Sequence, residues 1–330
     1  MTDYNNIMNT ESENLPLIES WDSYWQGALT SDAYTGGGST HPLVLGFWDD
    51  YFQKADGRED KPRIIDIASG NGAVIACASS VFSGALPEFT CLDVSDSAIN
   101  MLEERFPGVH GVVADAANIP LDSASYDIAT SQFGVEYAGL DALDEVLRLV
   151  AGDGELVLML HYRDGVIFRE CSASLEAVNE MEAAEFIPKC TDMFEAGFAA
   201  MQSGDLERYK AAVSAYAPAI KAMEAIMMKH GRDVGAGTIL KVYRDVRTIH
   251  SRMRHYDPSE IKEWLLNLQQ EIVAYAGRMA SMRDAAIDAS QFEQVRDKLL
   301  EEGFEILRAE PLAQSEQDLP LAWTLIAKKK

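Results

Sequence analysis

The sequence predicts an α/β protein with a doubly wound, mostly parallel sheet, which a large helical insertion interrupts between the fifth and sixth strands. Three observations lead to this fold class. Short apolar runs alternate with helical stretches between residues 61 and 164. Ala-, Glu- and Met-rich segments without strand character fill residues 165–290. The alternation of helix and strand then returns over residues 291–330.

The strands of the first α/β part are expected to be buried on both faces, because their apolar runs are continuous rather than alternating. They are predicted at residues 63–68, 88–93, 109–114, 126–131 and 155–161. The helices between them are predicted at residues 71–83, 96–106 and 140–150, followed by a turn at Gly152–Gly154. Near the C-terminus, a helix is expected at 291–302 and strands at 304–310 and 321–328.

These elements divide the chain into four parts. Residues 1–60 form a helical segment, 61–164 the first part of a sheet domain, 165–290 a helical cap and 291–330 the rest of the sheet domain. The cap is far longer than an ordinary loop, so we expect it to pack as a subdomain. Its many methionines suit either the core of a helical bundle or a surface that adapts to apolar ligands.

The N-terminal part carries a face of aromatic side chains. Trp21, Tyr24 and Trp25 are spaced to share one side of a helix. This face fits either a lid over a bound ligand or an anchor on the sheet domain. A glycine triplet at residues 36–38 breaks the segment, and His41-Pro42 is expected to start a second helix.

Composition disfavours several classes of function. The formal charge of −25 would repel phosphate backbones and anionic membrane surfaces, so no nucleic-acid or membrane partner is expected. No apolar run reaches the ~20 residues of a membrane span, and no secretion signal is visible, so a soluble cytoplasmic protein is expected. The four cysteines are expected to be buried thiols, and the ligand spacings predict no metal.

The first predicted strand ends in a glycine-bearing turn, "IIDIASGNGAV" at residues 64–74. Gly70 and Gly72 allow close approach of a ligand to the backbone, and the next helix offers free N–H groups. Such a turn also occurs as a plain strand-to-helix connection. Asp93 ends the second strand, where a carboxylate can accept hydrogen bonds from ribose hydroxyls or can cap the following helix.

Two features separate a sulfonium cofactor from a dinucleotide. The dinucleotide fingerprint requires a third glycine or an alanine, and Ile75 stands at that position. Asp66 lies just before the turn, where an acid suits a cationic ligand and disfavours a pyrophosphate. The turn therefore favours S-adenosylmethionine (SAM) over NAD.

These segments together resemble the class I SAM-dependent methyltransferases. "IIDIASGNGAV" is similar to the family's motif I, "CLDVS" with Asp93 to its ribose-binding segment, and "VVADAANIPLDSASYDIATSQFGVEY" with Asp115 to its adenine-binding and fourth-strand segments. The resemblance covers about residues 61–162 and 291–330. It implies a Rossmann-like sheet whose last strand is antiparallel, and SAM as the cofactor.

The resemblance also implies which residues hold SAM. Asp66 is placed near its amino group, Asp93 at the ribose and Asp115 at the adenine edge. The full implied set is Trp25, Asp66, Ser69, Gly70, Gly72, Asp93, Val94, Asp115, Ala116, Ser131 and Gln132.

The acceptor side of the site offers three candidate catalytic residues. His161 and Tyr162 end the fifth strand, and Glu136 follows the fourth. His161 is the best general base, unless it is a hydrogen-bonded structural histidine. Glu136 could instead bind a cationic acceptor or be a solvated acid.

The sequence is best explained by a SAM-dependent methyltransferase that acts on a small molecule, because a cap closes the site to large acceptors. A basic cluster at residues 241–254 indicates an anionic acceptor, or it pairs with neighbouring acids. The alternatives are an NAD-dependent oxidoreductase and a non-catalytic SAM-binding regulatory protein. The long helices could also bury the interface of a homodimer.

Overall fold

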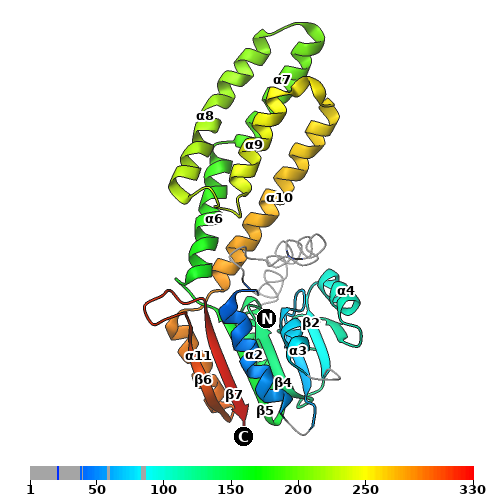
Figure 1. Cartoon of the computed structure of the whole chain (residues 1–330), viewed down its shortest axis with the longest axis vertical. Helices are drawn as coiled ribbons and strands as arrows, with labels where there is room; N and C mark the ends of the chain where they lie inside the picture. Colours follow the sequence, from blue (N-terminus) through cyan, green and yellow to red (C-terminus); the bar gives the residue numbers. More distant parts are fainter. Residues whose placement is uncertain (1–20, 22–37, 39, 58–59, 83–86) are drawn as a thin grey trace, which may run out of the picture. The chain divides into compact units, whose positions relative to one another are not determined.

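The computed structural model describes residues 21, 38, 40–57, 60–82 and 87–330 of the 330-residue chain. The chain divides into two compact units (Figure 1). The first, here the sheet unit, comprises Met1–Arg169 and Ser281–Lys330. The second, the helical unit, comprises Glu170–Ala280.

The sheet unit contains a seven-stranded sheet among the described residues. Its strands are β1 (Arg63–Ile67), β2 (Glu88–Asp93), β3 (His110–Val113), β4 (Tyr126–Gln132), β5 (Val150–His161), β6 (Phe304–Leu312) and β7 (Ala322–Lys329). Their order is β3-β2-β1-β4-β5-β7-β6. The first five strands pair in parallel, and β7 runs antiparallel to both β5 and β6. The predicted Rossmann-like sheet with an antiparallel last strand is confirmed.

The start of β5 differs from the prediction. Gly152–Gly154 was expected to form a turn, but β5 already begins at Val150 and runs through these glycines. The register with β4 shifts here, because Val150 pairs with Tyr126 whereas Glu155 pairs with Ile128. The glycines and Asp153, at a φ of 61°, therefore form a bulge inside a strand, which a sequence pattern does not distinguish from a turn.

Helices cover both faces of the sheet. They are α2 (Pro42–Asp56), α3 (Ala73–Val81), α4 (Asp96–Arg105), α5 (Leu143–Leu149) and α11 (Ala289–Glu301), with short 3₁₀ turns η1 (Val135–Ala138) and η2 (Leu140–Ala142). One core cluster joins α5 and α11 to alternate strand residues such as Ile65 and Leu158. Intervening residues point to the opposite side of the sheet, where Gln132 contacts Trp48 of α2.

The helix α2 begins as the sequence predicted. His41 accepts the Leu43 N–H through its Nδ1, and Pro42 occupies the first helical position. Trp48 is fully buried, and its Nε1 donates a hydrogen bond to Oε1 of Gln132. The Tyr51 hydroxyl donates to Glu155 Oε2 at 2.7 Å. This helix is therefore anchored on β4 and β5.

The helical unit has its own apolar core. The helices between β5 and α11 are α6 (Val166–Ala183), α7 (Phe186–Ser203), α8 (Glu207–His230), α9 (Thr238–Ser251), η3 (Met253–His255) and α10 (Pro258–Ala285). Met181, Met193, Met223 and Met253 are buried in that core. None of the helices in the described ranges is both long and apolar enough to cross a bilayer.

Replacement of Trp48 tests the anchoring of α2. Trp48→Phe removes the indole donor and leaves the Gln132 acceptor without it, so we expect the free energy of unfolding to fall by about 1–3 kcal/mol. Urea unfolding followed by circular dichroism measures this loss. Leu45→Ala on the outer side of the same helix is the control, because Leu45 is 37% exposed. Equal midpoints for the two variants would contradict the anchoring role.

Candidate active site

A pocket lies at the carboxyl ends of β1 to β4. Its described lining residues are Trp21, Ala68, Gly70, Leu92, Asp93, Val94, Ala114, Asp115, Ala116, Phe133, Gly134, Tyr137 and Ala138. The strand order reverses at this place, since β2 lies on one side of β1 and β4 on the other. Ligands bind at such switch points in open α/β sheets.

The glycine turn after β1 is tied to the end of β2. Ser69 donates its backbone N–H to the Leu92 carbonyl at 3.0 Å. Gly70 donates its N–H to Oδ2 of Asp93 at 2.8 Å. Gly70 and Gly72 have φ angles of 49° and 77°, a left-handed region that favours glycine. The turn therefore has one defined conformation at the pocket wall.

Asp93 is buried, and both of its carboxylate oxygens accept backbone hydrogen bonds. Oδ2 accepts from Gly70, and Oδ1 accepts the Ser95 N–H at 2.9 Å. Charge-assisted bonds of this kind fix the orientation of a carboxylate. Asp93 therefore organises the start of α4 and also lines the pocket, and its role toward a ribose stays a prediction.

Two lining residues that the sequence did not single out are conformationally special. Ala68 and Phe133 have φ angles of 53° and 52°, which side chains with a Cβ rarely adopt. Gly134 lies so close to Ala68 that a Cβ on Gly134 would be 2.5 Å from the Ala68 Cβ. The turns after β1 and β4 are therefore packed against each other. Strain of this kind often marks a functional site.

Asp115 and Ala116 form the pocket wall after β3. The Asp115 side chain is exposed, and its Oδ1 accepts the Ala117 N–H at 2.9 Å. The Asp115 carbonyl accepts the Asn118 N–H, also at 2.9 Å, which closes a tight turn. Ala116 is buried against this turn.

The lining of the pocket is acidic and aromatic. Asp93 and Asp115 are the charged side chains among the described lining residues, and both are acids. Trp21, Phe133 and Tyr137 supply aromatic rings, and the Trp21 and Tyr137 rings meet edge to face at 5.8 Å. Carboxylates and aromatic faces both attract a cation.

Several residues implied by the resemblance lie behind the pocket wall. Ser131 donates its hydroxyl to the Ile67 carbonyl at 2.9 Å and accepts the Val135 N–H at 3.0 Å. Gln132 accepts from Trp48, and Gly72 lies beside Leu102 and Phe106 of the α4 region. Ser69 is buried. None of these four is among the described lining residues, and Trp25 lies outside the described residues.

Asp66 is also buried behind the wall, at 1% exposure. Its Oδ1 accepts the Thr130 hydroxyl at 2.7 Å. Burial raises the pKa of Asp66 to about 7, and the nearby charge of Asp93 adds to this effect. The carboxyl group is therefore poised to change its charge near neutral pH.

Glu136 and His161 form a buried pair on the α2 side of β5. Glu136 Oε1 accepts the backbone N–H of His161 at 2.9 Å and lies 2.8 Å from Nδ1 of the His161 ring. The His161 ring lies 4.6 Å from the Phe133 ring and 5.6 Å from the Tyr137 ring, and both of these rings line the pocket. Glu136 Oε2 and His161 Nε2 are buried without a hydrogen-bond partner among the described residues.

Tyr162 does not lie beside Glu136 and His161. Successive strand residues point to opposite faces, and Tyr162 stacks on Trp323 with ring centroids 4.3 Å apart. It packs against the core cluster that contains α11. The structure therefore joins two of the three catalytic candidates, Glu136 and His161.

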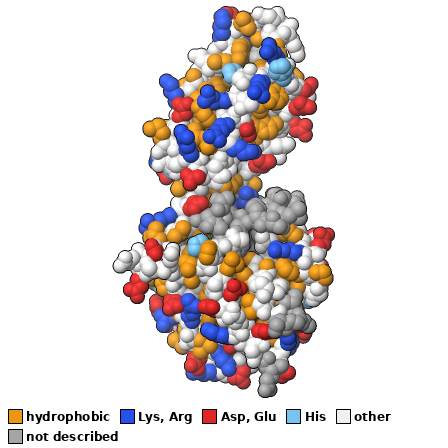
Figure 2. Space-filling view, viewed as in Figure 1, with side chains coloured by type: hydrophobic (Ala, Val, Ile, Leu, Met, Phe, Trp, Pro, Cys, Tyr) orange, Lys and Arg blue, Asp and Glu red, His pale blue; other side chains and the backbone are white. Residues whose placement is uncertain are grey.

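The helical unit carries the other polar clusters. Lys and Arg side chains gather on its visible face (Figure 2), and Lys241 contacts Asp245 at 3.9 Å. In the described part of the chain, Glu176, Glu180 and His230 are close enough together to share a metal ion. However, Lys229 Nζ already lies 2.6 and 2.7 Å from the two carboxylates. A bound cation is therefore disfavoured there.

Comparisons with known proteins find similarity to methyltransferases within the sheet unit. Residues 65–158 match the methyltransferase domain family. The chain is 31% identical over 102 residues to the ubiquinone/menaquinone biosynthesis C-methyltransferase UbiE of Campylobacter jejuni, across 29% of this chain and 43% of that protein. It is 33% identical over 101 residues to the demethylmenaquinone methyltransferase of Clavibacter sepedonicus, across 29% and 40%. The chain thus spans about two fifths of the length of these relatives.

A solved structure of the Bacillus subtilis YcgJ protein is similar at a TM-score of 0.31, with 21% identity over 36% of this chain and 52% of that chain. The domain match and the sequence relatives confirm the resemblance read from the motifs. Residues 65–158 therefore match a methyltransferase domain, in agreement with the class I SAM-dependent family that the motifs resemble.

The contact between Ala68 and Gly134 gives a prediction about stability. Gly134→Ala would place a Cβ against Ala68, so we expect it to lower the free energy of unfolding by about 1–3 kcal/mol. Ala68→Gly removes the opposing Cβ and should restore a large part of that loss in the double variant. Urea unfolding of the wild type, both single variants and the double variant measures the coupling. Strictly additive effects would contradict the contact.

Gly152→Ala is the control for this cycle. A Cβ on Gly152 would meet no atom within 4 Å, so its substitution should change stability little.

Asp66 gives a prediction about pH. Its folded-state pKa of about 7 lies above the unfolded value of 3.8, so the folded state retains a proton that the unfolded state loses. The resulting stabilisation is complete below pH 4 and is lost as the pH rises to about 7. We expect the stability of the wild type relative to Asp66→Asn to fall by up to about 1.4 kcal/mol per pH unit in this range. Urea unfolding from pH 4 to 8 measures it, and a flat difference would rule out a buried titrating Asp66.

Proposed function

We propose that this protein transfers a methyl group from SAM to a small-molecule acceptor. The observation that carries the proposal is the pocket at the switch point of the sheet, whose described charged side chains, Asp93 and Asp115, are both acids. A sulfonium cofactor with an adenosine group fits such a lining. A dinucleotide fits less well, because Ile75 stands where its pyrophosphate-binding turn requires a third glycine or an alanine.

The residues that would hold SAM follow from their places in the pocket. Asp93 lies at the end of β2, where a carboxylate can accept hydrogen bonds from ribose hydroxyls. Val94, Asp115 and Ala116 would surround the adenine, and Gly70 would approach the methionine part. When bound, SAM supplies an electrophilic methyl group attached to a good leaving group.

The catalytic task of the protein is to hold the acceptor in line with that methyl group and to remove a proton where the acceptor carries one. We assign proton removal to His161. An ionised Glu136 would accept the hydrogen on Nδ1 of His161, and this tautomer of the ring would carry its lone pair on Nε2. Glu136 thus serves as the residue that orients the base.

The class of acceptor is inferred from the relatives. Two of them are named for methylation in ubiquinone or menaquinone biosynthesis, which is methylation of a small molecule. That residues 165–290 form a cap over the acceptor stays a prediction from the sequence. An anionic acceptor, a homodimer and a cytoplasmic location stay predictions from the sequence.

Calorimetric titration with SAM, S-adenosylhomocysteine and NAD tests the cofactor. We expect the first two to bind and NAD not to bind. Asp93→Asn should lower the affinity for SAM and for S-adenosylhomocysteine at least tenfold, because an amide accepts hydrogen bonds less strongly than a carboxylate. The control is Asp96→Asn, an exposed acid three residues away that does not line the pocket.

Two results would contradict the proposal. Binding of NAD without SAM would favour the oxidoreductase. Binding of SAM without transfer of a radiolabelled methyl group to quinol acceptors or to a metabolite extract would favour the non-catalytic regulatory protein.

A further inference from the structure

The loop between β3 and β4 carries the adenine side of the pocket but contains little regular structure. It spans residues 114–125 and includes Asp115 and Ala116. Its first residue is fixed to the sheet, because Ala114 donates its N–H to the Asp93 carbonyl at 3.0 Å. The remainder needs partners from elsewhere for its backbone groups.

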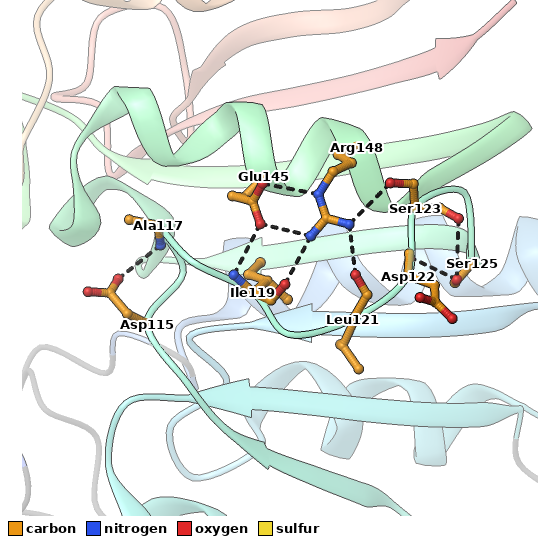
Figure 3. A network of polar contacts seen from close by, with 9 residues as sticks. All are labelled: Asp115, Ala117, Ile119, Leu121, Asp122, Ser123, Ser125, Glu145 and Arg148. Carbon is orange, nitrogen blue, oxygen red and sulfur yellow. Dashed lines mark hydrogen bonds and ion pairs between the residues drawn. The ribbon is translucent and has the colours of Figure 1, made fainter.

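Arg148, near the end of α5, supplies these partners (Figure 3). Its Nη2 donates to the Ile119 carbonyl at 2.9 Å, and its Nη1 donates to the Leu121 carbonyl at 2.7 Å and to Ser123 Oγ at 3.2 Å. The Arg148 carbonyl also accepts the Ala124 N–H at 2.8 Å. One residue therefore fixes four positions of the loop.

Glu145 holds the guanidinium in this orientation. Its two oxygens accept from Nε and Nη2 of Arg148 at 3.0 and 2.8 Å, a paired geometry that a planar guanidinium favours. Glu145 Oε2 also accepts the Ile119 N–H at 3.1 Å. These bonds lower the pKa of Glu145 and raise the pKa of Arg148, so both groups stay charged at neutral pH.

The pair is partly exposed, at 30% for the Arg148 side chain and 28% for that of Glu145. An exposed ion pair contributes little to stability by itself. Its value here is geometric, because Ile119 lies three residues after Ala116 and directly follows the tight turn closed by Asp115 and Asn118. The pair thus binds both backbone groups of the residue that follows that turn.

We propose that Arg148 and Glu145 are positioning residues that set the selectivity of the pocket for adenine over other purine bases. This inference rests on the proposed SAM site. An adenine edge offers an amino donor and a ring-nitrogen acceptor, whereas hypoxanthine reverses both. A carboxylate and a backbone N–H reject the reversed pattern only if they are held in place.

The test compares S-adenosylhomocysteine with S-inosylhomocysteine, which differs at that edge of the base. We expect the wild type to bind the adenine compound about 100-fold more tightly, or more. Arg148→Lys keeps the charge but loses the fork, and we expect it to reduce this ratio about tenfold. Calorimetry gives both dissociation constants, and their ratio is insensitive to a uniform loss of stability.

Arg63→Lys is the matched control. Arg63 makes a similar fork with Asp127, at 3.2 and 3.0 Å, but it starts β1 at the opposite end of the strand from the pocket. The ratio of the two dissociation constants in Arg63→Lys should equal that of the wild type. Glu145→Gln is a second variant of the same pair, for use if Arg148→Lys does not fold, and its ratio should also fall.

The outcomes separate the two proposals. A wild-type ratio near one, or an unchanged ratio in both variants of the pair, would overturn the positioning role and leave the SAM site intact. Failure of the wild type to bind S-adenosylhomocysteine would overturn the proposed function, and this inference with it.

Discussion

The candidate site depends on the carboxylate of Asp93. Its two oxygens accept the N–H groups of Gly70 and Ser95, so one side chain joins the turn after β1 to the start of α4. The backbone of the same residue accepts the Ala114 N–H and so fixes the beginning of the loop after β3. Asp93 therefore forms hydrogen bonds to three walls of the pocket. A ligand that bonds to Asp93 contacts the point at which these walls meet.

The fourth wall is fixed by close packing instead of charge. Gly134 fits against Ala68 because it lacks a Cβ, and Ser131 bonds to the Ile67 carbonyl behind it. Ala68 and Phe133 adopt left-handed backbone conformations on either side of this contact. The surrounding hydrogen bonds must offset the cost of these conformations, which is about 1–3 kcal/mol each. The turns after β1 and β4 are consequently packed directly against each other.

The sequence predicted the strands well because their signal is local. Continuous apolar runs and glycine turns mark β1, β2 and β4 within one or two residues. The bulge at Gly152–Gly154 was missed because glycine marks a turn and a bulge alike. His161 and Tyr162 were both proposed as catalytic, although alternation along a strand already places neighbours on opposite faces. The contacts of Arg148 and Gly134 join residues that are distant in the sequence. A single sequence does not reveal such contacts.

Electrostatics connects the proposed cofactor to two neighbouring acids, Asp66 and Asp93. Asp66 and Asp93 lie close enough that the charge of Asp93 helps to raise the pKa of Asp66. A cationic ligand near these groups would stabilise both ionised carboxylates and relieve their repulsion, whereas a pyrophosphate would increase it. Binding of a cation should therefore release a proton from Asp66 near neutral pH, and its affinity should rise with pH. The same acids that disfavour a dinucleotide in or near this pocket would favour the sulfonium cofactor proposed for it.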